Sequence, residues 1–151
     1  DKLTGLRNRN YLESRGDSLV NEDLPVSVIM LDCNYLKRTN DIHGHEMGDE
    51  LLRRTASVLR QVAGEDCLPM RLGGDEFLLV CPHTDGESAL GLEQDIRFGL
   101  AAVSDEVLTV SASIGVATVE TAGKTLADVY RVADHDMYRE KRMVHEQGTD
   151  C

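Results

Sequence analysis

The chain is expected to fold as an α+β protein in which helices cover a mainly antiparallel sheet. Three observations predict this. A run of branched apolar residues over 26–31 is typical of a buried strand. Two apolar arms around a Gly-Gly pair, over 71–80, predict a β-hairpin. Apolar residues recurring every three to four positions over 49–62 predict an amphipathic helix.

The first half begins with a polar lead-in and a short helix, for which Asn8 is the expected N-cap. The strand over 26–31 follows and ends at Asp32. Residues 40–48 are rich in turn formers and predict a turn. The helix over 49–62 comes next, with its apolar residues on one side and its arginines on the other.

The second half contains the hairpin over 71–80, a helix over 87–102, a strand over 108–117 and a last helix over 126–142. The expected order of elements is therefore α-β-α-β-β-α-β-α. Four apolar residues of the last helix are expected to face the core: Val129, Val132, Ala133 and Met137.

Length and charge limit the possible functions. The chain has 151 residues, enough for one domain over 1–151 and too few for two ordinary ones. It starts without a Met, so we expect it to be part of a longer protein. The net charge of −11 argues against a nucleic-acid binder, which needs a basic face. A small triphosphate held through a metal ion is compatible with this charge.

No apolar run approaches the ~18 residues of a membrane span, and the start has no signal-peptide pattern. We therefore expect no membrane contact from this segment. None of the four cysteines forms a CxxC pair, which favours reduced thiols in a cytoplasmic protein.

Three acidic residues stand where apolar segments become polar. Asp32 ends the buried strand, and Asp75 and Glu76 follow the Gly-Gly turn. If the hairpin pairs with the strand, all three meet at one edge of the sheet. Clustered carboxylates repel one another, and a hard divalent cation such as Mg²⁺ relieves that repulsion. The alternative is ordinary solvated turn composition, with Asp32 as a cap for the next turn.

Other residues could contact a nucleotide. Gly73 and Gly74 have no side chains and would let an anion or a purine approach the backbone, although a tight turn alone also explains them. Asn40 and Asp49 carry the amide and carboxylate that can read the edge of guanine, although a turn residue and a first-turn acid explain them equally. Three basic residues could contact phosphate or be surface cations: Lys37, Lys141 and Arg142.

Five ordered motifs resemble those of the GGDEF family of diguanylate cyclases. They lie at 1–9 (Asp-x-Leu-Thr-Gly-Leu-x-Asn-Arg), 32–49, 71–77 (Arg-Leu-Gly-Gly-Asp-Glu-Phe), 113–115 and 133–141. The resemblance covers nearly the whole chain. It implies a ferredoxin-like fold similar to that of nucleotide cyclases and polymerase palms. It also implies the joining of two GTP molecules into cyclic di-GMP with release of two pyrophosphates.

The resemblance also implies roles for individual residues. The implied ligands of Mg²⁺, with Mn²⁺ as a possible substitute, are Asp32, the backbone carbonyl of Cys33, Asp75 and Glu76. The implied catalytic residues are Asp32, Lys37, Asp75 and Glu76, with Glu76 as the base on the 3′-hydroxyl. The implied substrate-binding residues are Lys37 and Lys141 for phosphates, Asn40 and Asp49 for guanine, and Gly73, Gly74 and Arg71 beside the nucleotide.

Each domain would hold one GTP, so catalysis would need a homodimer, normally assembled by an upstream sensor domain in the same chain. The alternatives are a catalytically silent module that binds GTP or relays signals, and a related palm-type cyclase or polymerase. Three positions depart from the family pattern: Asn34 for Asp, Leu36 for Phe and His145 for Arg. The Arg-x-x-Asp motif for product inhibition is replaced by Gly64-Glu-Asp-Cys67, so no tight inhibition through that route is expected.

Overall fold

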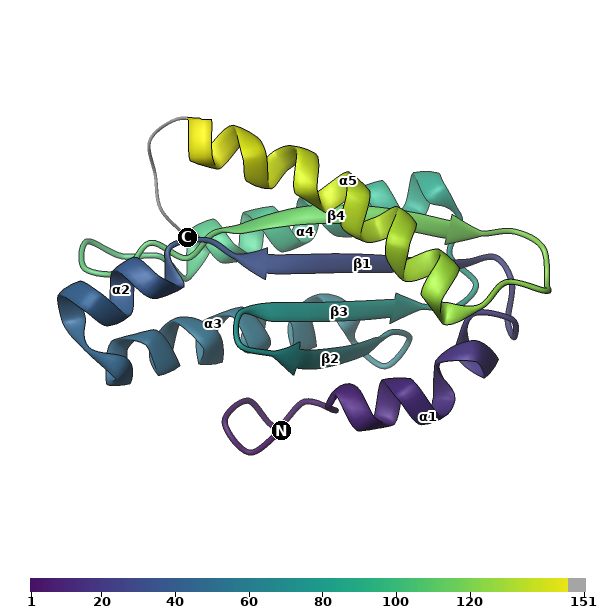
Figure 1. The fold of residues 1–151 in the computed structure, drawn as a ribbon, viewed down its shortest axis with the longest axis horizontal. Coiled ribbons are helices and arrows are strands. Elements are labelled where there is room, and N and C mark those ends of the chain that lie inside the picture. The colour runs from purple at the N-terminus through teal and green to yellow at the C-terminus, as the bar shows by residue number, and fades with distance from the viewer. Residues whose placement is uncertain (147–151) are drawn as a thin grey trace.

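A four-stranded sheet forms the centre of the molecule (Figure 1). The structure is a computed structural model that describes residues 1–146, with side chains as far as Val144. The strand order is β2-β3-β1-β4 and all neighbours are antiparallel. The strands are β1 (Val26–Cys33), β2 (Leu68–Gly73), β3 (Glu76–Cys81) and β4 (Ala112–Val119). The predicted α+β class with a mainly antiparallel sheet is confirmed.

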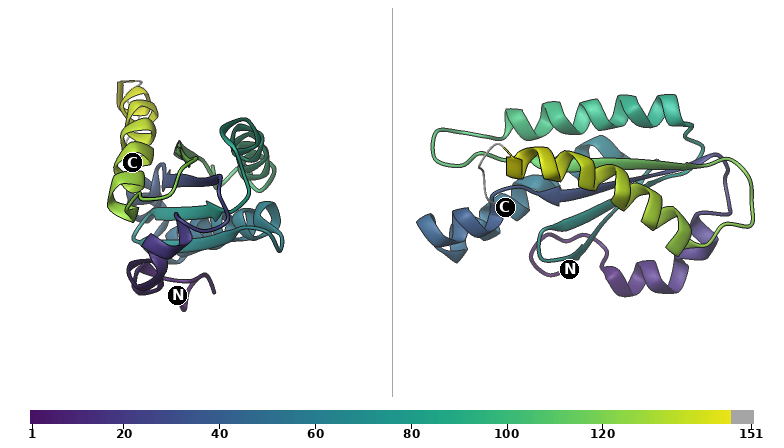
Figure 2. Two further views of the ribbon diagram at one scale, coloured as in Figure 1. Left: turned by 90° about the vertical axis from the view of Figure 1, so that its right-hand side faces the viewer. Right: turned by 45° about the horizontal axis from the view of Figure 1, so that its top comes forward.

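Five helices cover both faces of this sheet in the described part of the chain. They are α1 (Arg9–Leu19), α2 (Leu36–His43), α3 (His45–Ala63), α4 (Gly86–Ala102) and α5 (Leu126–Glu146). The end-on view in Figure 2 shows α3 and α4 on one face, and α1 and α5 on the other. None of the described helices has the length and apolar character needed to cross a bilayer.

The central strand β1 is buried along its whole length because helices cover both of its faces. Successive side chains enter opposite cores, as the two-residue period of a strand requires. Ile29 and Leu31 join the core under α3 and α4. Val28 and Met30 join the core under α1 and α5. This double burial explains why the segment is continuously apolar rather than alternating.

Several local predictions are confirmed. The Asn8 side chain accepts a hydrogen bond from the Tyr11 N–H at 3.1 Å and caps α1. The hairpin is formed by β2 and β3 around the Gly-Gly turn. In the last helix Val129, Ala133 and Met137 are buried. Val132 is 57% exposed, so its predicted inward position is wrong. The buried residues recur every four positions, and Val132 lies about 100° away from that line on the helix.

The predicted turn over 40–48 is also wrong, because helix continues on both sides of a single break. Helix α2 extends to His43 and α3 begins at His45. Gly44 lies between them with φ +88°, a conformation that favours glycine, and its N–H still bonds to Asn40 O at 2.9 Å. The order is therefore α-β-α-α-β-β-α-β-α, one helix more than predicted.

The fourth strand begins at Ala112, later than the predicted start at 108. Side chains take up the backbone groups before it. Asp105 accepts hydrogen bonds from the N–H groups of Val107 and Leu108, and Ser104 Oγ accepts one from Val110. These groups are unavailable for a strand ladder, so the segment forms a loop.

Candidate active site

Strand pairing brings the three predicted acids to one end of the sheet. In the β1–β3 register Asp32 lies opposite Glu76. The Cys33 N–H donates to Asp75 O at 2.8 Å, which fixes the turn against the end of β1. The conditional prediction that the hairpin lies beside the first strand is therefore confirmed.

Asp32 is a buried carboxylate with one partner and one open oxygen. The residue is 8% exposed. Its Oδ2 accepts a hydrogen bond from Lys141 Nζ at 2.5 Å, whereas its buried Oδ1 has no hydrogen-bond partner among the described residues. Burial raises the pKa of Asp32 to about 6. The nearby Asp75 carboxyl adds to this, and Lys141 opposes it.

This environment fits a divalent cation. An unpartnered buried oxygen next to a second carboxylate is costly without a positive charge to face it. Mg²⁺ commonly uses only one or two carboxylates and completes its shell with water and phosphate oxygens. Asp32 and Asp75 are two carboxylates that could serve as such ligands, and Cys33 lies beside them. Within residues 1–146 no three His, Cys, Asp or Glu side chains form a group that could hold a metal ion by themselves.

Glu76 is held by two side chains that no sequence motif singled out. Its Oε1 accepts a hydrogen bond from the Tyr130 hydroxyl of α5 and lies 3.9 Å from Arg9 Nη2 of α1. Burial and the neighbouring carboxylate raise the pKa of Tyr130 to about 12. Tyr130 is 54 positions from Glu76, so no local spacing could have revealed the contact.

A cavity of about 390 Å³ lies between α2 and the Gly-Gly turn. Its wall contains Leu36, Lys37, Asn40, Asp41, His45, Gly74 and Asp75. Asn40 is packed so closely against the start of α3 that any side chain at Gly48 would collide with its amide. Glycine at 48 therefore helps to position Asn40. Asp49 is the next residue but does not form part of this wall.

The Gly-Gly turn has a second cavity on its other side. Gly73 and Gly74 have φ values of +153° and +40°, which favour glycine. Arg71 donates to Gly74 O at 2.8 Å and pairs with Asp1 at 3.2 Å, so it braces the turn. This cavity of about 280 Å³ is lined by Asp1, Asn8, Arg9, Asn10, Arg71, Leu72, Gly73 and Gly74.

The structure thus divides the predicted residues into groups. Those that meet at the end of β1 are Asp32, Cys33, Asp75, Glu76 and Lys141. Those in the wall of the adjoining cavity are Lys37, Asn40, Gly74 and Asp75. Arg71 and Gly73 face the other cavity, and Asp49 faces neither. The Arg142 guanidinium lies 5.9 Å from the Tyr138 ring centroid, and the side chain of His145 is outside the described residues.

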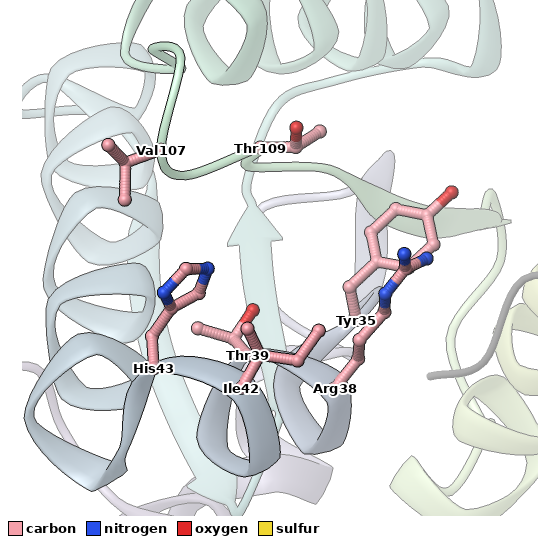
Figure 3. A pocket seen from close by; sticks show the side chains of 7 residues that line it. All are labelled: Tyr35, Arg38, Thr39, Ile42, His43, Val107 and Thr109. Carbon is pink, nitrogen blue, oxygen red and sulfur yellow. The ribbon is translucent and has the colours of Figure 1, made fainter.

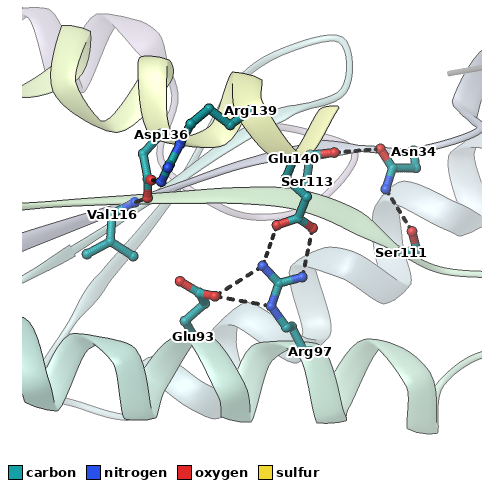
Figure 4. Close-up of polar contacts among 9 residues, drawn as sticks. All are labelled: Asn34, Glu93, Arg97, Ser111, Ser113, Val116, Asp136, Arg139 and Glu140. Atoms are coloured by element: carbon teal, nitrogen blue, oxygen red, sulfur yellow. Dashed lines mark hydrogen bonds and ion pairs between the residues drawn. The ribbon is translucent and has the colours of Figure 1, made fainter. Parts of the chain in front are cut away.

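Polar contacts hold the sheet and α5 in position around the site (Figure 4). Asn34 donates to Ser111 Oγ at 2.8 Å and accepts from Ser113 Oγ at 3.0 Å. At this departure from the family pattern, an uncharged amide therefore links the end of β1 to the start of β4. Arg97 of α4 donates to both Glu93 and Glu140. Glu140 immediately precedes Lys141, so the Arg97 pair fixes the part of α5 that carries this lysine.

A further cavity of about 350 Å³ lies between α2 and the loop that precedes β4 (Figure 3). Tyr35 and side chains of α2 face Val107 and Thr109 across it. Its wall is formed by Tyr35, Arg38, Thr39, Ile42, His43, Val107 and Thr109. None of the residues predicted to bind GTP or metal contributes to this cavity.

The fold and this site define a domain of the GGDEF family, and comparison with known proteins shows the same. Residues 1–147 match the family model described as "Diguanylate cyclase, GGDEF domain". The chain therefore belongs to the GGDEF family.

Individual proteins are also similar to this chain in sequence. The chain is 36% identical over 151 residues to the response regulator PleD of Caulobacter vibrioides, covering 93% of this chain and 33% of PleD. It is 34% identical over 146 residues to diguanylate cyclase DgcM of Escherichia coli, covering 93% of this chain and 35% of DgcM. It thus spans about a third of these relatives.

A solved structure has the same fold. The coiled coil and GGDEF domain of DgcB from Caulobacter crescentus, in complex with c-di-GMP, matches with a TM-score of 0.83 and 26% identity. The match covers 94% of this chain and 80% of that one.

Proposed function

We propose that this chain is a diguanylate cyclase domain that converts two GTP molecules into cyclic di-GMP and two pyrophosphates. The observation that carries the proposal is the buried Asp32, with an open Oδ1, a second carboxylate beside it and Lys141 Nζ at 2.5 Å. A cavity lined by Lys37 and Asn40 adjoins it and is within the usual size range of ligand sites, ~300–1,000 Å³.

In this proposal Asp32 and Asp75 hold Mg²⁺, or Mn²⁺, together with the Cys33 carbonyl, and Glu76 is a further ligand or the base on the 3′-hydroxyl. When bound, the ion neutralises charge on the phosphates and polarises the phosphorus. Lys37 and Lys141 stabilise the phosphate charge in the transition state. Asn40 reads the guanine edge from the cavity wall. Asp49, on α3, is the proposed second contact to guanine, although its side chain does not line the cavity.

The reaction joins two copies of the domain. The 3′-hydroxyl of one GTP attacks the α-phosphate of the other, the α–β phosphoanhydride bond breaks and pyrophosphate leaves. The 3′-hydroxyl of the second nucleotide then attacks the α-phosphate of the first in the same way, which closes the ring and releases the second pyrophosphate. One copy supplies half of a reacting pair, so a homodimer is required. The "coiled coil" of the DgcB structure and the "response regulator" name of PleD support an upstream dimerising or sensor region.

The test is product identification by mass after incubation of the chain with GTP and MgCl₂. We expect cyclic di-GMP, and we expect Asp75→Asn to reduce its formation by about 10³-fold or more, as for removal of a group that stabilises transition-state charge. The matched control is Asp95→Asn, an exposed acid on α4 that should keep full activity. A linear dinucleotide or a cyclic mononucleotide would refute the proposal.

The dimer requirement is tested separately by fusing a parallel coiled coil to the N-terminus. Linking two copies raises their effective concentration, so specific activity should rise at low enzyme concentration. An unchanged specific activity for the fusion would contradict dimer-limited catalysis.

A second candidate is a silent module that binds GTP without turnover. The observation that favours it is that helix α5 already engages both Asp32 and Glu76, through Lys141 and Tyr130. The same assay decides: GTP binding by calorimetry without any product would select this candidate.

A further inference from the structure

Cys67 and Cys81 face each other at the open end of the β2–β3 hairpin. Leu68 pairs with Val80, so the next residues outward, Cys67 and Cys81, lie opposite each other. The Cys67 N–H donates to Ala63 O at 3.1 Å and therefore points away from β3. Such non-hydrogen-bonded pairs have Cα atoms about 4.5 Å apart, within the ~4.4–6.8 Å range that a disulfide bridges.

The hydrogen bonds of β2 support this register. The Arg71 N–H, four residues further along, donates to Arg7 O at 2.8 Å and also points away from β3. Pro69, between them, has no N–H to donate. Residues 67, 69 and 71 therefore belong to the same series of non-hydrogen-bonded positions, in which opposing side chains come closest.

The two thiols differ in access. Cys81 is fully buried in the core under α3 and α4, and Cys67 packs against the same core while remaining half-buried. Cys67 also lines a cavity of about 190 Å³ whose wall includes Asp23, Asp66 and Pro82. A small reagent can therefore react directly with Cys67, whereas the buried Cys81 would react with the modified Cys67.

The two thiols also differ in acidity. A hydrogen bond from Cys81 lowers the pKa of Cys67, although burial and Asp66 oppose it. The same hydrogen bond, together with burial, raises the pKa of Cys81. The thiolate is the reactive form, so Cys67 is the better nucleophile of the two. Cys81 is placed for the second, resolving step by its position opposite Cys67.

We propose that Cys67 and Cys81 form a reversible thiol–disulfide pair that reacts with low-molecular-weight disulfides, RSSR. The Cys67 thiolate attacks one sulfur of RSSR, the S–S bond breaks, and RS⁻ leaves and takes up a proton. Cys81 then loses its proton and attacks Cys67 Sγ, which expels a second RS⁻. Two protein thiols are thereby oxidised to one disulfide, and one RSSR is reduced to two RSH.

The disulfide would fasten the hairpin at the end opposite the Gly-Gly turn. It closes the segment 67–81, which includes all of Gly73–Glu76. Cross-linking a loop of this length lowers the entropy of the unfolded chain and stabilises the fold. Thiol–disulfide exchange at this pair needs neither GTP nor a metal ion, so it does not depend on cyclase activity.

The experiment uses the full chain with Cys151→Ser, which leaves three of the four cysteines. The folded, reduced protein is treated with oxidised glutathione. We expect free thiols to fall from three to one, the intact mass to fall by two hydrogen atoms and peptide mapping to link residues 67 and 81. The melting temperature should rise by about 5 °C, and dithiothreitol should reverse every change.

Variants separate the two roles. In the same background Cys81→Ala should trap a stable glutathione adduct on Cys67, Cys67→Ser should leave Cys81 unreacted, and the control Cys33→Ala should still form the disulfide. The proposal is overturned if the folded parent keeps all three thiols, if it retains glutathione on Cys67 instead of resolving it, or if folded Cys81→Ala gains no adduct.

Discussion

The two ends of β1 each bury a polar side chain, but in opposite ways. At one end Ser27 is fully buried, donates to Thr84 O at 2.8 Å and lies 2.9 Å from Thr118 Oγ1. At the other end Asp32 carries a charge, has one unpartnered oxygen and has a raised pKa. The first end satisfies its polar groups within the fold, whereas the second leaves Asp32 Oδ1 without a hydrogen-bond partner among the described residues.

This difference separates residues that stabilise the chain from residues that act on a ligand. A satisfied neutral hydroxyl adds to stability, and its removal leaves other groups without partners. A buried, partly unpartnered carboxylate lowers stability and is retained where function needs it. Substitutions at the two ends should therefore move stability and activity in different directions.

The largest expected effect is the loss of activity in Asp32→Asn. Removing the carboxylate that would hold the cation should lower cyclic di-GMP formation by about 10³-fold or more. Steady-state kinetics with GTP and MgCl₂ measure this. Ser27→Ala, at the other end of the strand, should keep the activity of each folded molecule. Equal losses of activity per folded molecule in the two variants would contradict the assignment of Asp32 to ligand binding and Ser27 to stability.

Ser27→Ala should give the next largest effect, a loss of about 2 kcal/mol in the free energy of unfolding. The substitution leaves the buried Thr84 O and the partly buried Thr118 Oγ1 with one partner fewer. Urea denaturation measures the loss. The control is Ser57→Ala on the exposed side of α3, which should change stability by less than about 0.5 kcal/mol.

Asp32→Asn should also stabilise the metal-free chain by about 1 kcal/mol at pH 8. The pKa of Asp32 is raised from 3.8 to about 6, so the folded state binds its proton more tightly than the unfolded state does. Its contribution is therefore most favourable below pH 4 and is lost as the pH rises towards 6. Denaturation at pH 4 and pH 8 should show a gain only at the higher pH. The lost Lys141 contact reduces the gain, and a destabilised variant at pH 8 would show that the ion pair outweighs burial.

The smallest expected effect is that of Tyr130→Phe, which removes one hydrogen bond to Glu76. We expect a loss of about 0.5 kcal/mol in the free energy of unfolding because the contact is only partly buried. Tyr138→Phe on the same helix is the control, since Tyr138 is 54% exposed. A Tyr130 variant no different from this control would show that Arg9 alone suffices to hold Glu76.

Local sequence signals were sufficient for several elements. The Asn8 cap, the apolar run of β1, the Gly-Gly hairpin and the apolar face of α3 each depend on residues within a few positions of one another. The same local reasoning failed over 40–48, where polar residues that are common in turns extend two helices around Gly44. Composition there reflects exposure to solvent as much as backbone conformation.

By itself the sequence determined the α+β class, the motifs of the family and the identity of the acids at the end of β1. These depend on residue type and on short spacings, which the chain carries without folding. Only the tertiary structure decided that Asp32 pairs with the Lys141 side chain, that Tyr130 bonds to Glu76 and that Cys81 faces Cys67. Those partners are 109, 54 and 14 positions apart, and strand register and helix packing alone bring them together.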